Sequence, residues 1–229
     1  MKFELNLPTG VYTSQDAFIR PLDHPYGPIY IVDQVFEQSF VDSLHAVLKQ
    51  MAFVANEYDS DANRDVLHLK CELPAKVLLA GEVQDPGLLA LLPKQKGATH
   101  LSAVARITEQ ALQKLYPGYT GIEIGRIHVN SIPHGDILYV HEDGWPGASL
   151  TGLYFSNSTW QPEWNGELIL CDPMGESLYA IEPRPGRFVL FPGEIPHRGG
   201  APSRACYAHR LTIGHKFRAQ KQADSVYSD

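Results

Sequence analysis

The sequence predicts an α+β fold in which early helices cover a two-sheet β-sandwich or jelly roll. Two observations lead to this prediction. Apolar residues recur at helical spacing before residue 116, whereas from Gly121 onward short β-rich runs alternate with Gly, Pro, Asn and Asp. A chain of 229 residues can bury one sizeable core. We therefore expect a single domain over 1–229, with a supporting region of helices and strands over 1–120 and a β core over 121–217.

Two amphipathic helices are expected in the first half of the chain. Apolar side chains between residues 40 and 51 repeat at the spacing of one helical face. Ser39 and Asp42 resemble a capping box at the start of this helix. The helical pattern returns over 101–115 and stops at Pro117. Each helix therefore needs another element to cover its apolar stripe.

Seven β-strands are expected in the second half, because short β-branched and aromatic runs are bounded there by turn residues. The predicted strands cover residues 121–130, 137–141, 149–156, 166–171, 178–182, 187–192 and 205–217. The segment 56–64, "NEYDSDANR", is polar and has no apolar periodicity, so a loop is expected there.

Composition and charge argue against several classes of protein. The chain has 19 Lys and Arg against 26 Asp and Glu, a net charge of −7 that argues against nucleic acid or an anionic membrane as a partner. The three cysteines are widely spaced and form no C-x-x-C pair, and no stretch has the length of a signal peptide or membrane span. We therefore expect a cytoplasmic protein, monomeric or homodimeric, whose partner is a small molecule.

One short stretch combines a histidine and a carboxylate at metal-binding spacing. In "YVHEDGW" (139–145), His141 and Asp143 are two residues apart after an apolar run. Side chains at i and i+2 of an extended chain project from the same face, so both can reach one ion while Glu142 points away. A polar turn after a strand is the alternative interpretation of the same residues.

Two further features favour a metal site. His197 follows an apolar strand in "FPGEIPHRGG", and Arg210 lies 13 residues later on an alternating strand, with Thr212 two positions along. Two neutral imidazoles and one carboxylate on one face of an octahedral Fe(II) leave two positions for a chelating 2-oxo acid and one for O₂. The far carboxylate of that acid needs a cation, and a guanidinium offers a two-pronged hydrogen bond. Arg210 is the candidate, and Arg204 in the loop-like "GGAPSRA" is its rival.

At these residues the chain resembles the 2-oxoglutarate/Fe(II) dioxygenases, within them the prolyl 4-hydroxylase-like branch. The resemblance covers roughly 121–217, with "YVHED", "LYFSNSTWQPEWNGELIL", "IEPRPGRFVLFPGEIPH" and "HRLTI" in the family's order. Residues 27–51 are similar to the family's opening strand and helix. The resemblance implies a double-stranded β-helix, a jelly-roll or cupin-like fold, with N-terminal helices packed on the major sheet.

The resemblance also implies an iron-dependent oxidation. His141, Asp143 and His197 would be the metal ligands and the catalytic residues. Members of the superfamily that chlorinate have Ala or Gly in place of the carboxylate, so that halide can enter. Because Asp143 keeps its carboxylate, hydroxylation is expected.

The co-substrate implied by the resemblance is 2-oxoglutarate, with O₂ as the oxidant and ascorbate as a stimulant of turnover. Arg210 would bind its distal carboxylate, with Thr212 and Thr151 as further hydroxyl contacts. In related hydroxylases a tyrosine contacts the co-substrate, and the corresponding position in this chain is Tyr154 or Phe155.

Several substrates fit this chemistry. Trp145, Tyr139 and Asn130 are the candidate substrate contacts. Since the sequence shows no membrane anchor, secretion signal or peptide-recognition module, we expect hydroxylation of a small molecule, an amino acid or biosynthetic intermediate, with release of succinate and CO₂. A peptidyl-prolyl hydroxylase with a groove beside 56–64 is one alternative. A non-catalytic cupin-type metal-binding protein is the other, although a cupin has no need of a buried cation such as Arg210.

Overall fold

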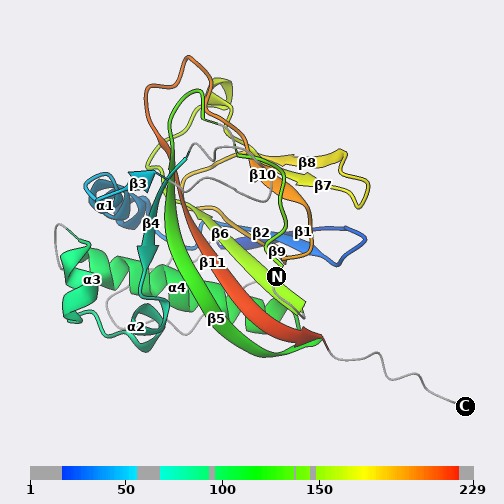
Figure 1. Cartoon of the computed structure of the whole chain (residues 1–229), viewed down its shortest axis with the longest axis horizontal. Helices are drawn as coiled ribbons and strands as arrows, with labels where there is room; N and C mark the ends of the chain where they lie inside the picture. Colours follow the sequence, from blue (N-terminus) through cyan, green and yellow to red (C-terminus); the bar gives the residue numbers. More distant parts are fainter. Residues whose placement is uncertain (1–16, 56–67, 93–95, 137, 145–147, 222–229) are drawn as a thin grey trace, which may run out of the picture.

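Eleven β-strands form two antiparallel sheets in the computed structural model, which describes residues 17–55, 68–92, 96–136, 138–144 and 148–221 (Figure 1). The large sheet has the order β1-β2-β9-β6-β11-β5-β4-β3, and the small sheet has the order β10-β7-β8. The strands are β1 (Phe18–Leu22), β2 (Ile29–Asp33), β3 (Val54–Ala55), β4 (Leu69–Leu73), β5 (Tyr119–Ile132), β6 (Ala148–Phe155), β7 (Leu168–Cys171), β8 (Ser177–Ile181), β9 (Phe188–Pro192), β10 (His197–Gly199) and β11 (Arg210–Lys221).

The helices lie on the side of the large sheet that faces away from the small sheet (Figure 1). They are α1 (Gln38–Leu48), α2 (Ala75–Ala80), α3 (Pro86–Ala90) and α4 (Lys96–Leu115), and a 3₁₀ turn, η1, covers Pro162–Trp164. The long helix α4 contacts β5 and β6. It approaches β6 closely because Gly152 has no side chain: a Cβ there would overlap the methyl group of Thr108. The predicted helix-covered jelly roll is confirmed.

Two apolar cores explain why the chain stacks in these layers. The first core lies between the helices and the large sheet and includes Leu44, Val104 and Ile213. The second joins the two sheets and includes Phe155 and Leu170. Strand alternation supplies both cores, since successive side chains of a strand point to opposite faces.

Both predicted helices are present, with different starts. The helix expected over 40–51 is α1, and the helix expected over 101–115 is α4, which begins five residues earlier. The predicted capping box is wrong: Glu37 is the N-cap residue of α1, and no side chain caps the helix. Among the described helices, none is long and apolar enough to cross a lipid bilayer.

Five of the seven predicted strands match β5 to β9 closely, and two need correction. The expected strand over 137–141 is absent from its described residues 138–141, where His141 forms only a single bridge with His197. The last strand begins at Arg210 rather than at residue 205. Cys206 instead closes a turn, in which its N–H donates to the Ser203 carbonyl at 2.9 Å. The predicted loop over 56–64 lies outside the described residues.

His215 makes the stability of this fold depend on pH. It is fully buried on β11, and its Nδ1 lies 3.2 Å from the Gly152 carbonyl oxygen. Burial lowers the pKa of His215 to about 4 from 6.5. The folded protein therefore binds fewer protons than the unfolded chain between these two values, so the free energy of unfolding falls as the pH falls through that window.

We expect His215→Gln to flatten this dependence, by about 3 kcal/mol in total between pH 7 and pH 4. Urea unfolding across this pH range measures it, with the exposed His134→Gln as the matched control. An identical pH profile for His215→Gln and the unmodified protein would contradict the assignment.

Candidate active site

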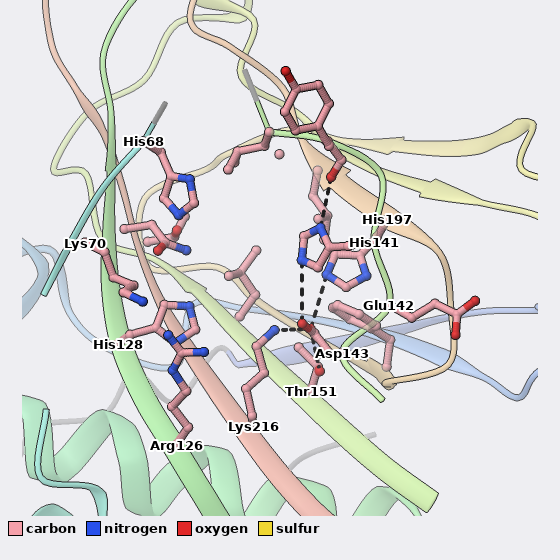
Figure 2. Close-up of a pocket in the computed structure, with 18 of the residues that line it drawn as sticks. His68, Lys70, Arg126, His128, His141, Glu142, Asp143, Thr151, His197 and Lys216 are labelled. Carbon is pink, nitrogen blue, oxygen red and sulfur yellow. Dashed lines mark hydrogen bonds and ion pairs between the residues drawn. The ribbon is translucent and has the colours of Figure 1, made fainter. Parts of the chain in front are cut away.

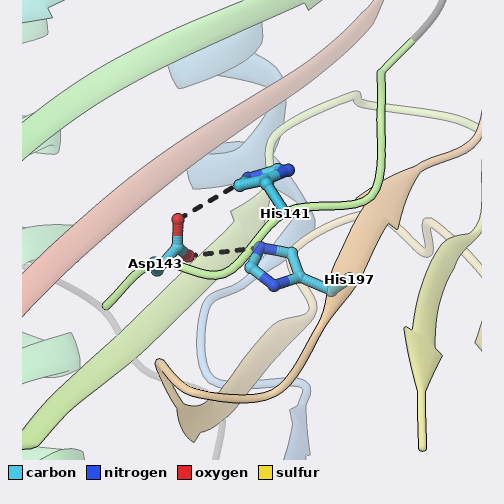
Figure 3. Close-up of side chains that lie close together, drawn as sticks. All are labelled: His141, Asp143 and His197. Carbon is cyan, nitrogen blue, oxygen red and sulfur yellow. Dashed lines mark ion pairs between the residues drawn. The ribbon is translucent and has the colours of Figure 1, made fainter. Parts of the chain in front are cut away.

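Three side chains from two separated segments meet at one point. His141 and Asp143 lie in the segment that follows β5, and His197 is the first residue of β10 (Figure 3). One potential ligand atom from each residue lies within 4.8 Å of the other two. Asp143 Oδ1 is 3.6 Å from His141 Nε2, and Asp143 Oδ2 is 3.2 Å from His197 Nε2. The side chains expected at the metal therefore converge.

Backbone hydrogen bonds hold the two histidines side by side. The His141 N–H donates to the His197 carbonyl at 3.0 Å, and the His197 N–H donates to the His141 carbonyl at 2.9 Å. The N–H of Asp143 donates to the Gly193 carbonyl at 2.8 Å. These bonds fix the segment 138–144 against β10 and the end of β9, although the segment is not a regular strand.

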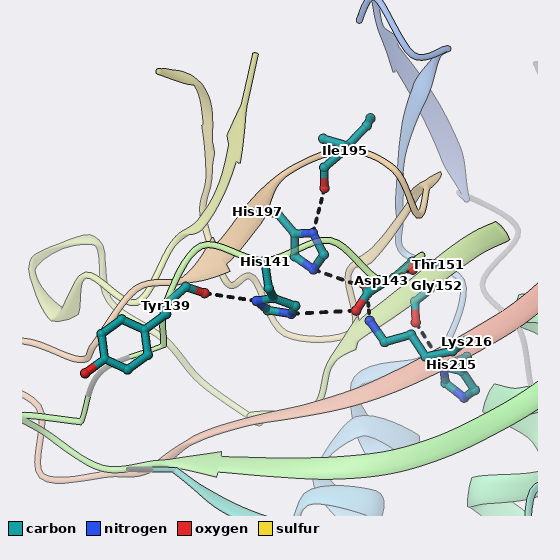
Figure 4. A network of polar contacts seen from close by, with 9 residues as sticks. All are labelled: Tyr139, His141, Asp143, Thr151, Gly152, Ile195, His197, His215 and Lys216. Atoms are coloured by element: carbon teal, nitrogen blue, oxygen red, sulfur yellow. Dashed lines mark hydrogen bonds and ion pairs between the residues drawn. The ribbon is translucent and has the colours of Figure 1, made fainter. Parts of the chain in front are cut away.

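Each imidazole is oriented by its second ring nitrogen (Figure 4). His141 Nδ1 lies 2.9 Å from the Tyr139 carbonyl oxygen, and His197 Nδ1 lies 2.8 Å from that of Ile195. A carbonyl can only accept, so each Nδ1 carries a proton, and in the neutral ring Nε2 then presents a lone pair to the centre. Loss of solvation in the cavity, where the side chain is still 48% exposed, and the neighbouring His197 lower the pKa of His141 to about 4. His141 is therefore neutral at pH 7, the state in which an imidazole binds metal.

Asp143 is held ionised by Lys216, a residue that is not among the predicted site residues. Although burial opposes ionisation, the Lys216 ammonium and His197 hold the pKa of Asp143 well below its usual range. Lys216 donates to Asp143 Oδ2, and the Thr151 hydroxyl donates to the same oxygen at 2.9 Å (Figure 4). Oδ1 remains directed toward His141 Nε2. The centre thus offers two imidazole nitrogens and a carboxylate oxygen, a donor set suited to Fe(II).

Arg210 places a buried cation in the same cavity. Its side chain is almost fully buried at the start of β11, and its Nε donates to the Gly166 carbonyl at 2.5 Å. The guanidinium carbon lies 5.0 Å from the centre of the Phe155 ring. Burial lowers the pKa of Arg210 to about 10, so it stays charged at neutral pH. Gly199 leaves room for this group, because a Cβ there would lie 3.2 Å from Arg210 Nη1.

Two polar atoms, one in the Arg210 guanidinium and one in the nearby Thr212 hydroxyl, have no hydrogen-bond partner. Arg210 Nη2 and Thr212 Oγ1 are both buried and unpaired. Buried polar groups are normally satisfied, and leaving a charged donor unpaired is costly. An anionic ligand with carboxylate oxygens would satisfy both atoms, so the residues present fit 2-oxoglutarate.

The cavity that joins these groups has a volume of about 400 Å³ (Figure 2). It is lined by His68, Lys70, Arg126, His128, Asn130, Leu138, Tyr139, His141, Glu142, Asp143, Gly144, Thr151, Leu153, Leu168, Phe191, His197, Gly199, Arg210, Thr212 and Lys216. All three predicted metal ligands therefore share one chamber with Arg210, Thr212, Asn130 and Tyr139.

The remaining candidates differ in where the structure places them. Tyr154 is packed in the core between helices and sheet, so its hydroxyl does not line the cavity, whereas Phe155 lies on the opposite face beneath Arg210. Arg204 is exposed in a turn and does not line the cavity. Trp145 lies outside the described residues.

The sequence of this chain matches a known family model over the core of the site. Residues 127–217 match the family described as the 2OG-Fe(II) oxygenase superfamily. No curated protein sequence matches the chain. The matched segment contains all three converging side chains as well as Arg210.

Solved structures with this fold include enzymes with different kinds of substrate. One is a prolyl-4-hydroxylase from Pseudomonas putida, with 20% identity, a TM-score of 0.51 and coverage of 80% of this chain and 88% of that one. Another is SnoK, an alpha-ketoglutarate dependent carbocyclase from nogalamycin biosynthesis, with 14% identity, a TM-score of 0.55 and coverage of 87% and 84%. A third is HygX from Streptomyces hygroscopicus with nickel and 2-oxoglutarate bound, with 11% identity, a TM-score of 0.53 and coverage of 83% and 82%.

Fold, donor set and family model agree on the class of protein. Over residues 127–217 the chain is similar in sequence to the 2OG-Fe(II) oxygenase superfamily. This match and the fold indicate a dioxygenase, and the matched family uses Fe(II) and 2-oxoglutarate.

Proposed function

We propose that this dioxygenase hydroxylates an unactivated C–H bond of a small molecule. Its iron ligands would be His141, Asp143 and His197, and Arg210 would anchor 2-oxoglutarate. The observation that carries the proposal is the shared cavity: three metal-ligating side chains meet there beside a buried guanidinium with an unpaired donor. Fe(II), 2-oxoglutarate and O₂ together would supply the oxidation, placing one oxygen atom in the product alcohol and the other in succinate, with release of CO₂.

The protein's own residues orient the proposed metal ligands and the co-substrate, and they keep water out of the cavity. The Tyr139 and Ile195 carbonyls fix the histidine tautomers, while Lys216 and Thr151 fix the Asp143 carboxylate. Thr151 was expected to contact 2-oxoglutarate, but its hydroxyl is used by Asp143, so we assign it a positioning role.

Arg210 would hold the distal carboxylate through charge-assisted hydrogen bonds, with Thr212 donating one more. Leu153, Leu168 and Phe191 form an apolar wall of the cavity that limits access of water.

The size of the cavity supports a small substrate. About 400 Å³ lies at the lower end of the range for ligand pockets, and 2-oxoglutarate must occupy part of it. The relation to SnoK, a carbocyclase from a biosynthetic route, fits the same class. The prolyl hydroxylases of the same fold make a peptidyl-prolyl substrate the second candidate. The family match speaks against a non-catalytic cupin.

The wider setting of the enzyme is also part of this proposal. We place 1–229 in one catalytic domain, acting as a monomer or homodimer. Cys71, Cys171 and Cys206 are buried and unbridged, in keeping with a reducing, cytoplasmic location.

Spectroscopy and turnover test the proposal together. Anaerobic addition of Fe(II) and 2-oxoglutarate should give the weak visible metal-to-ligand charge-transfer band of the chelate. On admission of O₂, one member of a panel of amino acids and metabolites should stimulate succinate release. The control omits Fe(II) and should show neither signal. Absence of the band at saturating 2-oxoglutarate would contradict the proposed function, and stimulation by proline-containing peptides alone would favour the peptidyl-prolyl alternative.

A further inference from the structure

The cavity wall opposite the three metal-ligating residues is basic (Figure 2). Lys70 comes from β4, Arg126, His128 and Asn130 come from β5, and we call these four residues the basic wall. Strand pairing aligns them: Lys70 lies opposite Asn130, and Arg126 lies opposite Lys216 of β11. All four line the cavity and share the inward face of the large sheet.

The charges on this wall are not balanced within the described residues. Glu72, whose side chain is 58% exposed, lies 2.5 Å from Arg126 Nη2 and 3.5 Å from Lys70 Nζ, so one carboxylate faces two cations. Lys216 is already paired with Asp143. Of the two carboxylates that line the cavity, Asp143 is the partner of Lys216, and Glu142 points away from the wall in Figure 2. One positive charge therefore remains for a ligand.

Unpaired polar atoms lie on the same wall. Arg126 Nε, His128 Nδ1 and Asn130 Oδ1 are buried and lack hydrogen-bond partners. Burial, Lys216 and Arg126 together lower the pKa of His128 well below 6.5, so it is a neutral group that can donate a hydrogen bond without adding charge. Gly214 gives this ring its space, since a Cβ there would lie 2.9 Å from it.

This wall is separate from the proposed anchor for 2-oxoglutarate. Arg210 and Lys216 are six residues apart on β11, which places their backbones about 20 Å apart along the strand. Arg126 pairs with Lys216, and Arg210 pairs with Ile132. Two cationic regions thus lie at opposite ends of the cavity: the basic wall at one end and Arg210 at the other. Lys216, which contacts Asp143, lies at the end of the basic wall.

We propose that the basic wall binds a carboxylate of the substrate, so that the enzyme oxidises a small carboxylic acid. This inference rests on the proposed function, and it names the substrate class. A planar carboxylate matches the fork of Arg126, and its single negative charge balances the one unpaired positive charge of the wall. A phosphate dianion would bring a second negative charge that the wall does not balance. Holding the acid group on this wall directs the rest of the molecule across the cavity toward His141, Asp143 and His197.

Matched substrates test the inference directly. Small carboxylic acids, each supplied with its primary amide and its phosphate-ester analogue, are screened for stimulated succinate release by the iron-loaded enzyme. We expect acids to be the active compounds and their amides to have kcat/KM values at least about 10-fold lower, as for loss of one charge-assisted contact. Equal activity of the amides, or activity confined to the phosphate esters, would overturn the carboxylate assignment.

Variants then locate the contact. Arg126→Gln and Lys70→Gln should each raise KM for the active acid by about 10-fold or more, while the dissociation constant of 2-oxoglutarate, measured from the charge-transfer band, changes little. Glu72→Gln removes the competing carboxylate and should lower KM or leave it unchanged. Arg184→Gln, which alters an exposed arginine paired with Glu182, is the matched control and should not change KM.

The outcomes separate the two proposals. The inference fails if Arg126→Gln keeps the KM of the unmodified protein, or if Glu72→Gln raises KM as much as Arg126→Gln does. The basic wall is then structural, and the proposed function still stands because the charge-transfer band is still observed. If the unmodified protein gives neither a band nor stimulated turnover, the proposed function fails as well.

Discussion

Asp143→Ala should abolish product formation and weaken Fe(II) binding by roughly 100-fold or more. Loss of a partner that merely orients a metal ligand commonly costs 10- to 100-fold, and Asp143 is proposed as a ligand itself. The substitution also strands Lys216, whose ammonium is nearly buried beside the carboxylate. Breaking such a pair should lower the free energy of unfolding by about 3 kcal/mol.

The double variant Asp143→Ala/Lys216→Met separates these two effects. It removes the stranded cation, so it should recover much of the lost stability while remaining inactive. Fe(II) titration, succinate assay and urea unfolding measure the three quantities on the same preparations. Undiminished substrate-coupled succinate formation by Asp143→Ala would rule out His141, Asp143 and His197 as the iron site.

Arg210→Ala should raise the dissociation constant of 2-oxoglutarate by between about 10-fold and about 150-fold. This range corresponds to the roughly 1.5–3 kcal/mol of a hydrogen bond to a charged group. The affinity for Fe(II) should change little, since the described contacts of Arg210 are with Gly166 and Phe155 and not with the proposed metal ligands. Titration of 2-oxoglutarate against the charge-transfer band of the iron-loaded protein measures the effect.

Two matched variants define what Arg210 contributes. Arg210→Lys keeps the charge but loses the fork, so its 2-oxoglutarate affinity should lie between those of Arg210→Ala and the unmodified protein. Arg204→Gln alters the exposed rival and should bind 2-oxoglutarate normally. Normal binding by Arg210→Ala together with weak binding by Arg204→Gln would exchange the roles of the two arginines.

Part of the arrangement of the proposed metal ligands could be predicted from sequence, because short-range geometry carries that information. His141 and Asp143 share a face by i, i+2 spacing, and Arg210 shares a face with Thr212 on β11. The convergence of His197 with the first pair depends on β10 lying beside the segment 138–144. That pairing spans 56 residues, and the family resemblance indicated it where local pattern could not.

Other parts of the fold could not be read locally. The run 137–141 is apolar enough for a strand, yet its described residues make only the bridge at His141, because a ladder requires a partner that propensity does not specify. Cys206 and Ala208 alternate with Arg210 in sequence, but turn hydrogen bonds delay the strand until Arg210.

Lys216 and the basic wall illustrate a different limit. Continuing the alternation from Arg210 by six residues would have placed Lys216 on the inward face, so a signal was available. The same alternation counted back from Asn130 along the predicted strand would have placed Arg126 on its face. Lys70 gave no such signal, since β4 is short and its pairing with β5 brings together positions far apart in the chain. The complete basic wall becomes visible only once β4 and β5 are aligned.

A crystal structure of the protein grown anaerobically with Fe(II) and 2-oxoglutarate tests the central claim most directly. It should show the metal bound by His141 Nε2, Asp143 Oδ1 and His197 Nε2, with the distal carboxylate of 2-oxoglutarate within hydrogen-bonding distance of Arg210. A metal bound elsewhere, or a distal carboxylate held by Lys70 and Arg126 instead, would contradict the account.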